Sequence, residues 1–320
     1  MKLVVATHGH CFDGLASAVL FTHLARALHD GEPLELSYRA CGYGAGQARA
    51  DDAMLTGDAN AILDYRYHPC EKLSWYFDHH RTAFASDEDR AHFEARRNNG
   101  HFFYDAEATS CTKLIAQLAR EHFDVDAPSL AELVAWADRI DSARFESAEQ
   151  AVDRSDPLMQ FVSVVEHYGD DAFLTRFVPE LLTRPVREVA ALPEVLARYR
   201  PLGKKHDRFV DSVKRQSLRQ GRVVFVDLTA EVLDSVGKFV TYALFPDSVY
   251  SVIIGLMKHG PKISVGYNPW SGRPRDADIS SICARYGGGG HPVVGGIAFT
   301  NAEIDRARHV AREIAAELAG

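Results

Sequence analysis

The sequence predicts an α/β protein in which a mainly parallel sheet flanked by helices precedes a second, smaller α/β domain. The first hundred residues follow a strand-helix-strand-strand order, and a new series of apolar strands begins after residue 221. The length of 320 residues also favours two domains, because single cores stop growing at about 250–300 residues. We therefore expect a first domain over residues 1–185, a helical linker over 186–220 and a second domain over 221–320.

The first domain alternates short apolar segments with stretches of helical spacing. Its predicted strands are residues 3–6, 34–39, 61–64 and 74–77, and its predicted helices begin at Gly14, Ser110 and Ser129. The last two helices run to about residue 121 and to Asp141. Residues 86–100 are polar and charge-rich, which predicts a loop or an exposed helix.

The linker is charged and helical, and we expect Pro193 and Pro201 to interrupt it. The second domain is predicted to contain strands over 222–227, 250–256 and 262–266, a loop over 268–276, and helices over 277–286 and 302–318.

Composition limits the function classes. The formal net charge of −8 and pI near 6.0 argue against a protein that coats long nucleic acid, because such proteins neutralise many phosphates with Lys and Arg. The five cysteines form no CxxC pair, so reduced thiols are expected. No segment has the length of a signal peptide or membrane span. These features predict a soluble, cytoplasmic protein that does not bind long duplexes or membranes.

Histidine and aspartate follow three of the predicted strands. The first strand leads into His8 and Asp13, the strand over 61–64 ends in Asp64, and Trp75-Tyr76-Phe77 is followed by the triplet over 78–80, Asp-His-His. Because ligands bind at the carboxyl edge of open α/β sheets, we expect these side chains to gather at one edge.

A site that mixes carboxylates and imidazoles suits a transition metal such as Mn²⁺. Each residue alone has an ordinary explanation; Asp13, for instance, could cap a helix. Their common position at strand ends in one domain favours a metal site. The candidate ligands are His8, Asp13, Asp64, His79 and one aspartate of the 138–141 region.

These motifs, together with Gly287-Gly288-Gly289-Gly290-His291, resemble those of the DHH/DHHA1 phosphoesterases of the RecJ-like superfamily, which include nano-ribonucleases. The resemblance covers nearly the whole chain. It implies a catalytic DHH domain, a substrate-binding DHHA1 domain and an active site in the cleft between them. It also implies two Mn²⁺ ions, with Mg²⁺ or Co²⁺ as alternatives, and short oligonucleotides or nucleotides as substrates. A homodimer is left open.

The resemblance implies a role for each residue. His8 binds one metal, Asp64 bridges both, and Asp13 and His79 bind the second with an aspartate of the fourth motif. Asp78 orients its neighbouring histidine, and His80 faces the substrate phosphate.

Two positions depart from the family pattern or leave it ambiguous. Many members carry Asp-x-Asp in the first motif, where this chain has Cys11. Cys11 is then either a metal ligand or a spectator, and in the second case His10 could supply the ligand that the cysteine does not. In the fourth motif, Asp141 has the family spacing to Phe145, and Asp138 lies on the same helix face as the alternative.

Four consecutive glycines leave backbone amides that a ligand can approach closely. β-like residues on both sides, Tyr286 before and residues 297–299 after, argue against a mere hinge. The resemblance implies that Gly288, Gly289, Gly290 and His291 bind substrate. Arg273 and Arg275 are candidates to replace an arginine that family members often carry in the preceding strand.

The predicted reaction is hydrolysis of phosphodiester bonds in short oligonucleotides by a water shared between two metals. The alternatives are a phosphatase acting on 3′-phosphoadenosine 5′-phosphate, a phosphodiesterase acting on cyclic or linear dinucleotides, and a nucleotide sensor without hydrolytic activity. A structural zinc protein is disfavoured because the chain lacks a Cys/His set with closed-site spacing.

Overall fold

The computed structural model describes residues 1–29, 33–42, 50–233, 237 and 239–320. These residues form two compact units. Met1–Arg144 and Arg154–Leu202 make up the first unit, and Phe145–Asp153 and Gly203–Gly320 make up the second. Among the described helices, none is both long and apolar enough to cross a bilayer.

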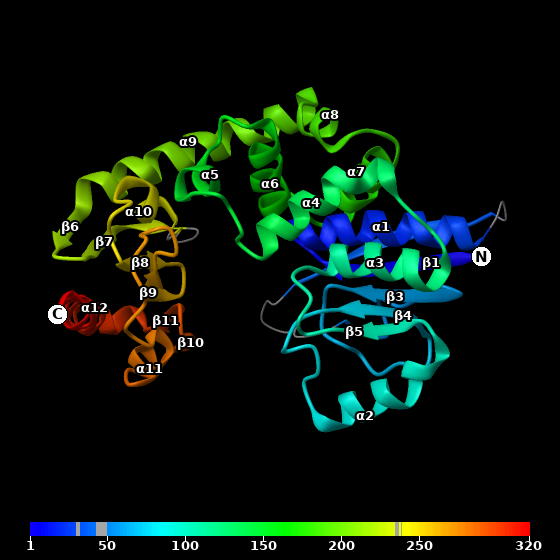
Figure 1. Ribbon diagram of the computed structural model, residues 1–320, viewed down its shortest axis with the longest axis horizontal. Helices are drawn as coiled ribbons and strands as arrows, with labels where there is room; N and C mark the ends of the chain where they lie inside the picture. The colour runs from blue at the N-terminus through cyan, green and yellow to red at the C-terminus, as the bar shows by residue number, and fades with distance from the viewer. Residues whose placement is uncertain (30–32, 43–49, 234–236, 238) are drawn as a thin grey trace. The chain divides into compact units, whose positions relative to one another are not determined.

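The first unit is built on a parallel sheet in the order β2-β1-β3-β4-β5 (Figure 1). Its strands are β1 (Lys2–His8), β2 (Glu35–Cys41), β3 (Ala59–Leu63), β4 (Leu73–Asp78) and β5 (Phe102–Tyr104). The predicted parallel sheet is confirmed. The strand β5 was not predicted, because its three residues give too short a pattern to distinguish a strand from a loop.

Helices cover both faces of this sheet. Phe21 of α1 (Phe12–Leu28) packs against Trp75 and Phe77 of β4. The side chain between them, Tyr76, points to the opposite face and packs against Phe93 of α2 (Asp87–Arg96), as expected from the alternation of side chains along a strand. Figure 1 shows α1 and α3 (Cys111–Phe123) on one side of the strands and α2 on the other.

Further helices complete the chain between the sheets. They are α4 (Ala131–Asp141), α5 (Ala148–Val152), α6 (Pro157–Tyr168), α7 (Asp171–Thr183), α8 (Val186–Ala190) and α9 (Pro193–Gln216). The linker was predicted to be interrupted at Pro193 and at Pro201. The break at Pro193 is confirmed, because α8 ends at Ala190 and α9 begins at Pro193, but the break at Pro201 is wrong. Pro193 is the first residue of α9, where a missing N–H costs nothing, and Pro201 is accommodated inside the helix.

The second unit contains a mixed sheet in the order β10-β11-β9-β8-β7-β6, in which only β7 and β8 pair in parallel among the described strands. The strands are β6 (Ser217–Gln220), β7 (Val223–Leu233), β8 (Tyr250–Met257), β9 (Gly260–Tyr267), β10 (Gly289–His291) and β11 (Val294–Ala298). The helices are α10 (Phe239–Leu244), α11 (Ile279–Ala284) and α12 (Ile304–Ala319). Val310 and Ile314 of α12 pack into the apolar core with Val252 and Ile263 of the sheet. The predicted α/β class is confirmed for both units.

Candidate metal centre

The parallel sheet brings the predicted side chains to one edge. His8 is the last residue of β1, Asp64 directly follows β3, and the Asp-His-His triplet begins with the last residue of β4. β1 and β4 both neighbour β3. Their carboxyl ends therefore lie side by side.

Asp64 lies at the middle of the group. Its backbone has a φ of 54°, a left-handed conformation that aspartate tolerates better than most residues, and its N–H donates to Phe77 O at 2.9 Å. The carboxylate is 1% exposed and lies 3.5 Å from His8 Nδ1 and 3.4 Å from His79 Nε2. Burial raises the pKa of Asp64, but His79 and His8 outweigh burial and hold the pKa below its usual value. Asp64 is thus an anion.

Asp13 is held at the beginning of α3. One carboxylate oxygen accepts a hydrogen bond from the Cys111 N–H at 2.7 Å, and the other accepts one from the Thr112 N–H at 3.0 Å. Such N-terminal amides favour a negative charge. Burial, followed by the nearby Asp64 and Asp141, nevertheless raises the pKa of Asp13 well above its usual value. The two amides fix the orientation of the Asp13 carboxylate, but they do not offset the burial and the neighbouring carboxylates that disfavour its negative charge.

His79 faces three carboxylates. Its Nδ1 donates to Ala108 O at 3.1 Å, because a carbonyl oxygen can only accept. Its Nε2 lies 3.4 Å from Asp64, 3.4 Å from Asp141 and 3.8 Å from Asp13. Burial lowers the pKa of His79, but the carboxylates outweigh burial and raise it to about 10. In the absence of a metal, a proton on Nε2 offsets part of the carboxylate charge.

The unsatisfied atoms of this group fit a divalent cation. Both oxygens of Asp64 and Nε2 of His79 are buried and have no hydrogen-bond partner among the described residues. Buried polar atoms of this kind cost free energy unless a ligand satisfies them. The potential ligand atoms form three overlapping groups, each within 4.8 Å: His8, Cys11 and Asp64; Asp64, His79 and His80; and Asp13, His79 and Asp141. Carboxylate and imidazole ligands suit Mn²⁺ and related ions.

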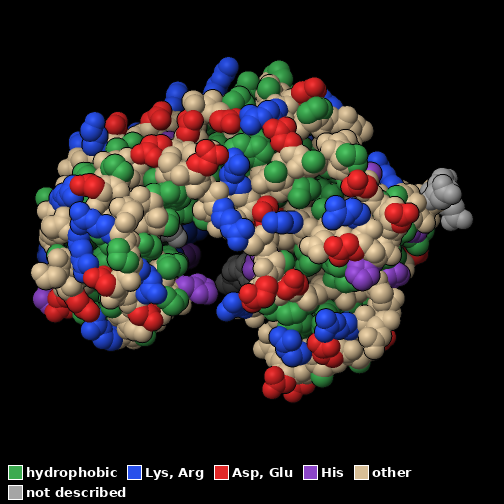
Figure 2. Space-filling view, viewed as in Figure 1, with side chains coloured by type: hydrophobic (Ala, Val, Ile, Leu, Met, Phe, Trp, Pro, Cys, Tyr) green, Lys and Arg blue, Asp and Glu red, His purple; other side chains and the backbone are tan. Residues whose placement is uncertain are grey.

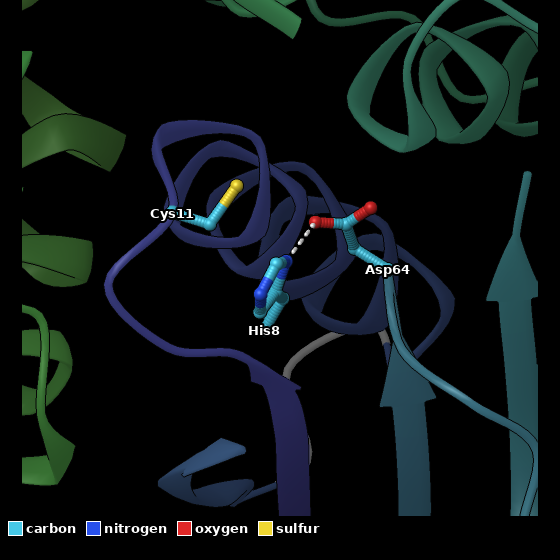
Figure 3. A group of neighbouring side chains, drawn as sticks. All are labelled: His8, Cys11 and Asp64. Carbon is cyan, nitrogen blue, oxygen red and sulfur yellow. Dashed lines mark ion pairs between the residues drawn. The ribbon is translucent and has the colours of Figure 1, made fainter. Parts of the chain in front are cut away.

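Cys11 belongs to the first of these groups. Figure 3 shows its sulfur and the His8 ring near the Asp64 carboxylate. Cys11 precedes α1 and its side chain makes no capping hydrogen bond. Burial, together with Asp64 and Asp13, raises the pKa of the thiol well above its usual value. The alternative, His10, is exposed and lines a separate pocket of about 420 Å³ with Cys41 and Asp170. The geometry therefore favours Cys11.

Asp141 and Asp138 have different surroundings, although they are one helical turn apart at the end of α4. Asp141 faces His79. Asp138 accepts a hydrogen bond from Thr109 Oγ1 and pairs with Lys113 Nζ at 3.0 Å. Asp138 therefore contacts the loop that carries Ala108, whose carbonyl holds His79. The geometry favours Asp141 as the ligand.

Comparisons with known proteins test the fold. No family model matches the chain, and neither does any curated protein. A pGpG-specific phosphodiesterase, PggH from Vibrio cholerae, is 18% identical with a TM-score of 0.64, over 98% of this chain and 99% of that one. An exopolyphosphatase-related protein from Bacteroides fragilis is 14% identical with a TM-score of 0.55, over 99% of this chain and 93% of that one.

RecJ from Thermus thermophilus, in complex with Mn²⁺, is 12% identical with a TM-score of 0.59. The match covers 99% of this chain but 52% of RecJ. The chain has the fold of the DHH-domain proteins. The predicted family resemblance is confirmed at the level of the fold.

Hydrogen bonds hold the side chains of the triplet that gives the DHH fold its name. Asp78 Oδ1 accepts hydrogen bonds from His80 Nδ1 at 2.7 Å and from the His80 N–H at 3.3 Å. The other oxygen of Asp78 accepts from the Tyr76 hydroxyl at 3.0 Å. Asp78 therefore fixes the ring of His80, whereas the Ala108 carbonyl fixes the ring of His79. The other ring nitrogen of His80, Nε2, takes no part in these hydrogen bonds.

The glycine run belongs to the second unit. Gly289, Gly290 and His291 form the exposed edge strand β10, which pairs with β11. Gly290 has a φ of 150°, and a Cβ there would lie 2.2 Å from Val294 O. The expected β conformation after the run is confirmed, but Tyr286 lies in the turn after α11, not in a strand. Arg273 and Arg275 are exposed; the Arg275 guanidinium donates to Ala277 O at 2.6 Å.

Several contributors to the site escaped the sequence analysis. They are the Cys111 and Thr112 amides that hold Asp13, the Ala108 carbonyl that holds His79, and the Thr109 and Lys113 side chains around Asp138. The predicted helix start at Ser110 was the one available signal, because helix N-termini attract carboxylates. Contacts made by backbone groups leave no residue-type pattern.

Proposed function

We propose that this chain is a metal-dependent phosphoesterase that hydrolyses phosphodiester bonds of short oligonucleotides with Mn²⁺. The observation that carries the proposal is the buried convergence of Asp64 and His79, whose ligand atoms lack hydrogen-bond partners among the described residues. A purely structural ion pair would instead satisfy these atoms. The DHH fold supports the same interpretation.

Two ions fit two of these three groups of ligand atoms. His8, Cys11 and Asp64 would hold one, and Asp13, His79 and Asp141 would hold the other, with Asp64 near both. Bound ions at such a site polarise a phosphoryl oxygen and lower the pKa of water. The Ala108 carbonyl keeps the proton of neutral His79 on Nδ1, so that Nε2 is the nitrogen available as a ligand.

His80 is the residue we propose to contact the phosphate. Burial lowers its pKa, but Asp78 and Asp64 outweigh burial and raise it. With Nδ1 donating to Asp78, His80 needs a second proton, on Nε2, to act as a donor to the phosphate, and the Asp78 carboxylate favours that protonated ring. His80 then donates a hydrogen bond to a non-bridging oxygen as negative charge develops there, and Asp78 keeps the ring in position.

Surface charge favours a short substrate. Figure 2 shows acidic and basic side chains interspersed over the displayed face, and the formal net charge is −8. A protein that follows a long strand needs a continuous basic groove. PggH is described as specific for pGpG, which makes linear dinucleotides the first substrates to test. All five cysteines are free thiols, which supports the proposal of a reducing, cytoplasmic environment.

The test is hydrolysis of a substrate panel with Mn²⁺, Mg²⁺ or Co²⁺. The panel contains linear dinucleotides, RNA and DNA of two to twenty nucleotides, cyclic dinucleotides and 3′-phosphoadenosine 5′-phosphate. We expect turnover that requires the metal, is fastest for the shortest oligomers and is lost in Asp64→Asn. An Asp124→Asn protein, changed at an exposed position of the same unit, is the matched control.

The other outcomes separate the alternatives. Phosphate release from 3′-phosphoadenosine 5′-phosphate alone would make the chain a phosphomonoesterase. Nucleotide binding without turnover of any substrate would favour a sensor. Undiminished activity of Asp64→Asn would contradict the proposed centre.

A further inference from the structure

We infer that Asp52, His68 and Cys70 form a second metal site that takes Zn²⁺ and is separate from the proposed catalytic centre. Their ligand atoms lie within 4.8 Å of one another, and none of the three belongs to the groups around Asp64. The site joins the turn that carries Asp52 to the segment between β3 and β4. The inference does not rest on the proposed function.

Two of the three ligands are held in place by their surroundings. The Cys70 carbonyl accepts hydrogen bonds from Arg96 Nη1 at 2.8 Å and from the Leu73 N–H at 3.0 Å. Cys70 itself is 8% exposed and packs in the apolar cluster below the sheet with Tyr67. The Tyr67 N–H donates to Ala83 O at 2.8 Å, which fixes the residue before His68. Metal sites need such preorganised ligands.

The third ligand, Asp52, is able to adjust. Its side chain is 75% exposed, whereas that of His68 is 13% exposed. The carboxylate lies 2.7 Å from His68 Nε2, a hydrogen-bond distance that must open when both atoms bind one cation. Hydrogen bonds from His68 and from Cys70 lower the pKa of Asp52. The Asp52 carboxylate thus accepts hydrogen bonds from both His68 and Cys70, and a bound metal ion would take the place of the two protons between them.

The ligand set selects the metal. A thiolate, an imidazole and a carboxylate together suit Zn²⁺, and the thiolate disfavours Mg²⁺ and Ca²⁺. On binding, the Cys70 thiol releases its proton to solvent, and neutral His68 carries its proton on Nδ1 so that Nε2 binds the ion. His68 Nδ1 is buried without a hydrogen-bond partner among the described residues. On metal binding this nitrogen would become an N–H donor, and no described residue is placed to accept from it.

A bound Zn²⁺ ion should hold the turn that carries Asp52 against the segment between β3 and β4. Residues 51–54 form a turn in which the Met54 N–H donates to the Asp51 carboxylate. A metal that binds only the folded protein raises its stability by mass action. We expect Zn²⁺ to raise the melting temperature of the full chain even in Asp64→Asn, which lacks the proposed catalytic bridge.

The experiment is a Co²⁺ titration of the full chain followed by near-ultraviolet absorption, which reports a cobalt–thiolate bond. It uses Cys11→Ser, so that the thiol near Asp64 does not contribute. We expect the absorption to persist in Cys11→Ser and to disappear when Cys70→Ser is added. Adding Cys283→Ser, a buried thiol of the second unit, should leave it unchanged.

Asp52→Asn provides a second test in case the Cys70 variant misfolds, because Asp52 is exposed and its replacement should leave the fold intact. We expect it to weaken Zn²⁺ affinity about tenfold or more, measured by competition with a chromophoric chelator, while Asp124→Asn matches the wild type. Absence of the absorption in Cys11→Ser, or its survival in Cys11→Ser/Cys70→Ser, would overturn the inference. Wild-type Zn²⁺ affinity in Asp52→Asn would do the same.

Discussion

Replacing Asp138 by alanine tests whether this residue positions the metal centre without binding a metal. Asp138 accepts the hydrogen bond of Thr109 and pairs with Lys113. Thr109 follows Ala108, whose carbonyl holds His79. Losing Asp138 should therefore loosen the loop that sets the direction of His79.

The expected magnitude follows from these contacts. A hydrogen bond to a charged group contributes about 1.5–3 kcal/mol. The pair with Lys113 adds at most about 1 kcal/mol, because the lysine side chain is 49% exposed. We expect Asp138→Ala to lower the free energy of unfolding by about 2–3 kcal/mol. Mn²⁺ affinity should fall about 10–100-fold, the usual cost of losing a group that supports a ligand.

Urea denaturation without metal and Mn²⁺ titration calorimetry provide the two readouts. Lys113→Met is the matched control. It removes the exposed ion pair and the 3.3 Å hydrogen bond from Lys113 Nζ to Thr109 Oγ1 but keeps the bond between Thr109 and Asp138. Its free energy of unfolding should fall by at most about 1 kcal/mol, and its Mn²⁺ affinity should stay near that of the wild type. The reasoning is refuted if Asp138→Ala binds Mn²⁺ as tightly as the wild type. It is also refuted if Lys113→Met loses as much affinity as Asp138→Ala.

Three further predictions concern other parts of the molecule. Burial and the neighbouring Asp64 raise the pKa of Asp141, which means that its negative charge is unfavourable in the metal-free protein. Asp141→Asn should therefore be at least as stable as the wild type without metal, but Mn²⁺ should raise its melting temperature less. An unchanged rise would argue against Asp141 as a ligand. A Cβ at Gly14 would lie 2.0 Å from His8 O, whereas one at Gly296 has no neighbour closer than 3.4 Å. Gly14→Ala should therefore lose several kcal/mol in urea denaturation or fail to fold, and Gly296→Ala should not. Burial lowers the pKa of His101, so the folded protein binds the proton of this side chain less readily than the unfolded chain does. The contribution of neutral His101 to stability is therefore complete above the unfolded pKa of about 6.5 and is lost as the pH falls below it. His101→Phe should flatten the decline of the urea midpoint between about pH 7.5 and 5.5.

The candidate centre could be predicted largely from sequence because its ligands follow strands. The short apolar runs before His8 and Asp64 are typical of buried parallel strands, and parallel strands place their carboxyl ends together. That geometry brings residues 8, 64 and 79 together although they are far apart in the chain. The choice between Asp138 and Asp141 was left open, because both share a helix face and only the fold places Lys113 beside Asp138.

Other features could not be predicted because they depend on tertiary contacts. Residues 86–100 were predicted to form a loop or an exposed helix. The helix is confirmed as α2, but Phe93 on it is buried against Tyr76. Pro201 was expected to break a helix that continues through it. The grouping of Asp52 with His68 and Cys70 depends on how the turn before β3 lies against the segment after it, and no sequence spacing encodes that.

The most direct test of the central claim is Mn²⁺ binding to the wild type and to Asp64→Asn, measured by titration calorimetry at neutral pH. Asparagine keeps the shape of the side chain but removes the charge that lies beside both His8 and His79. The account predicts Mn²⁺ binding by the wild type and loss of that binding, with the fold retained, in the variant. Equal affinity and stoichiometry in the two proteins would contradict it.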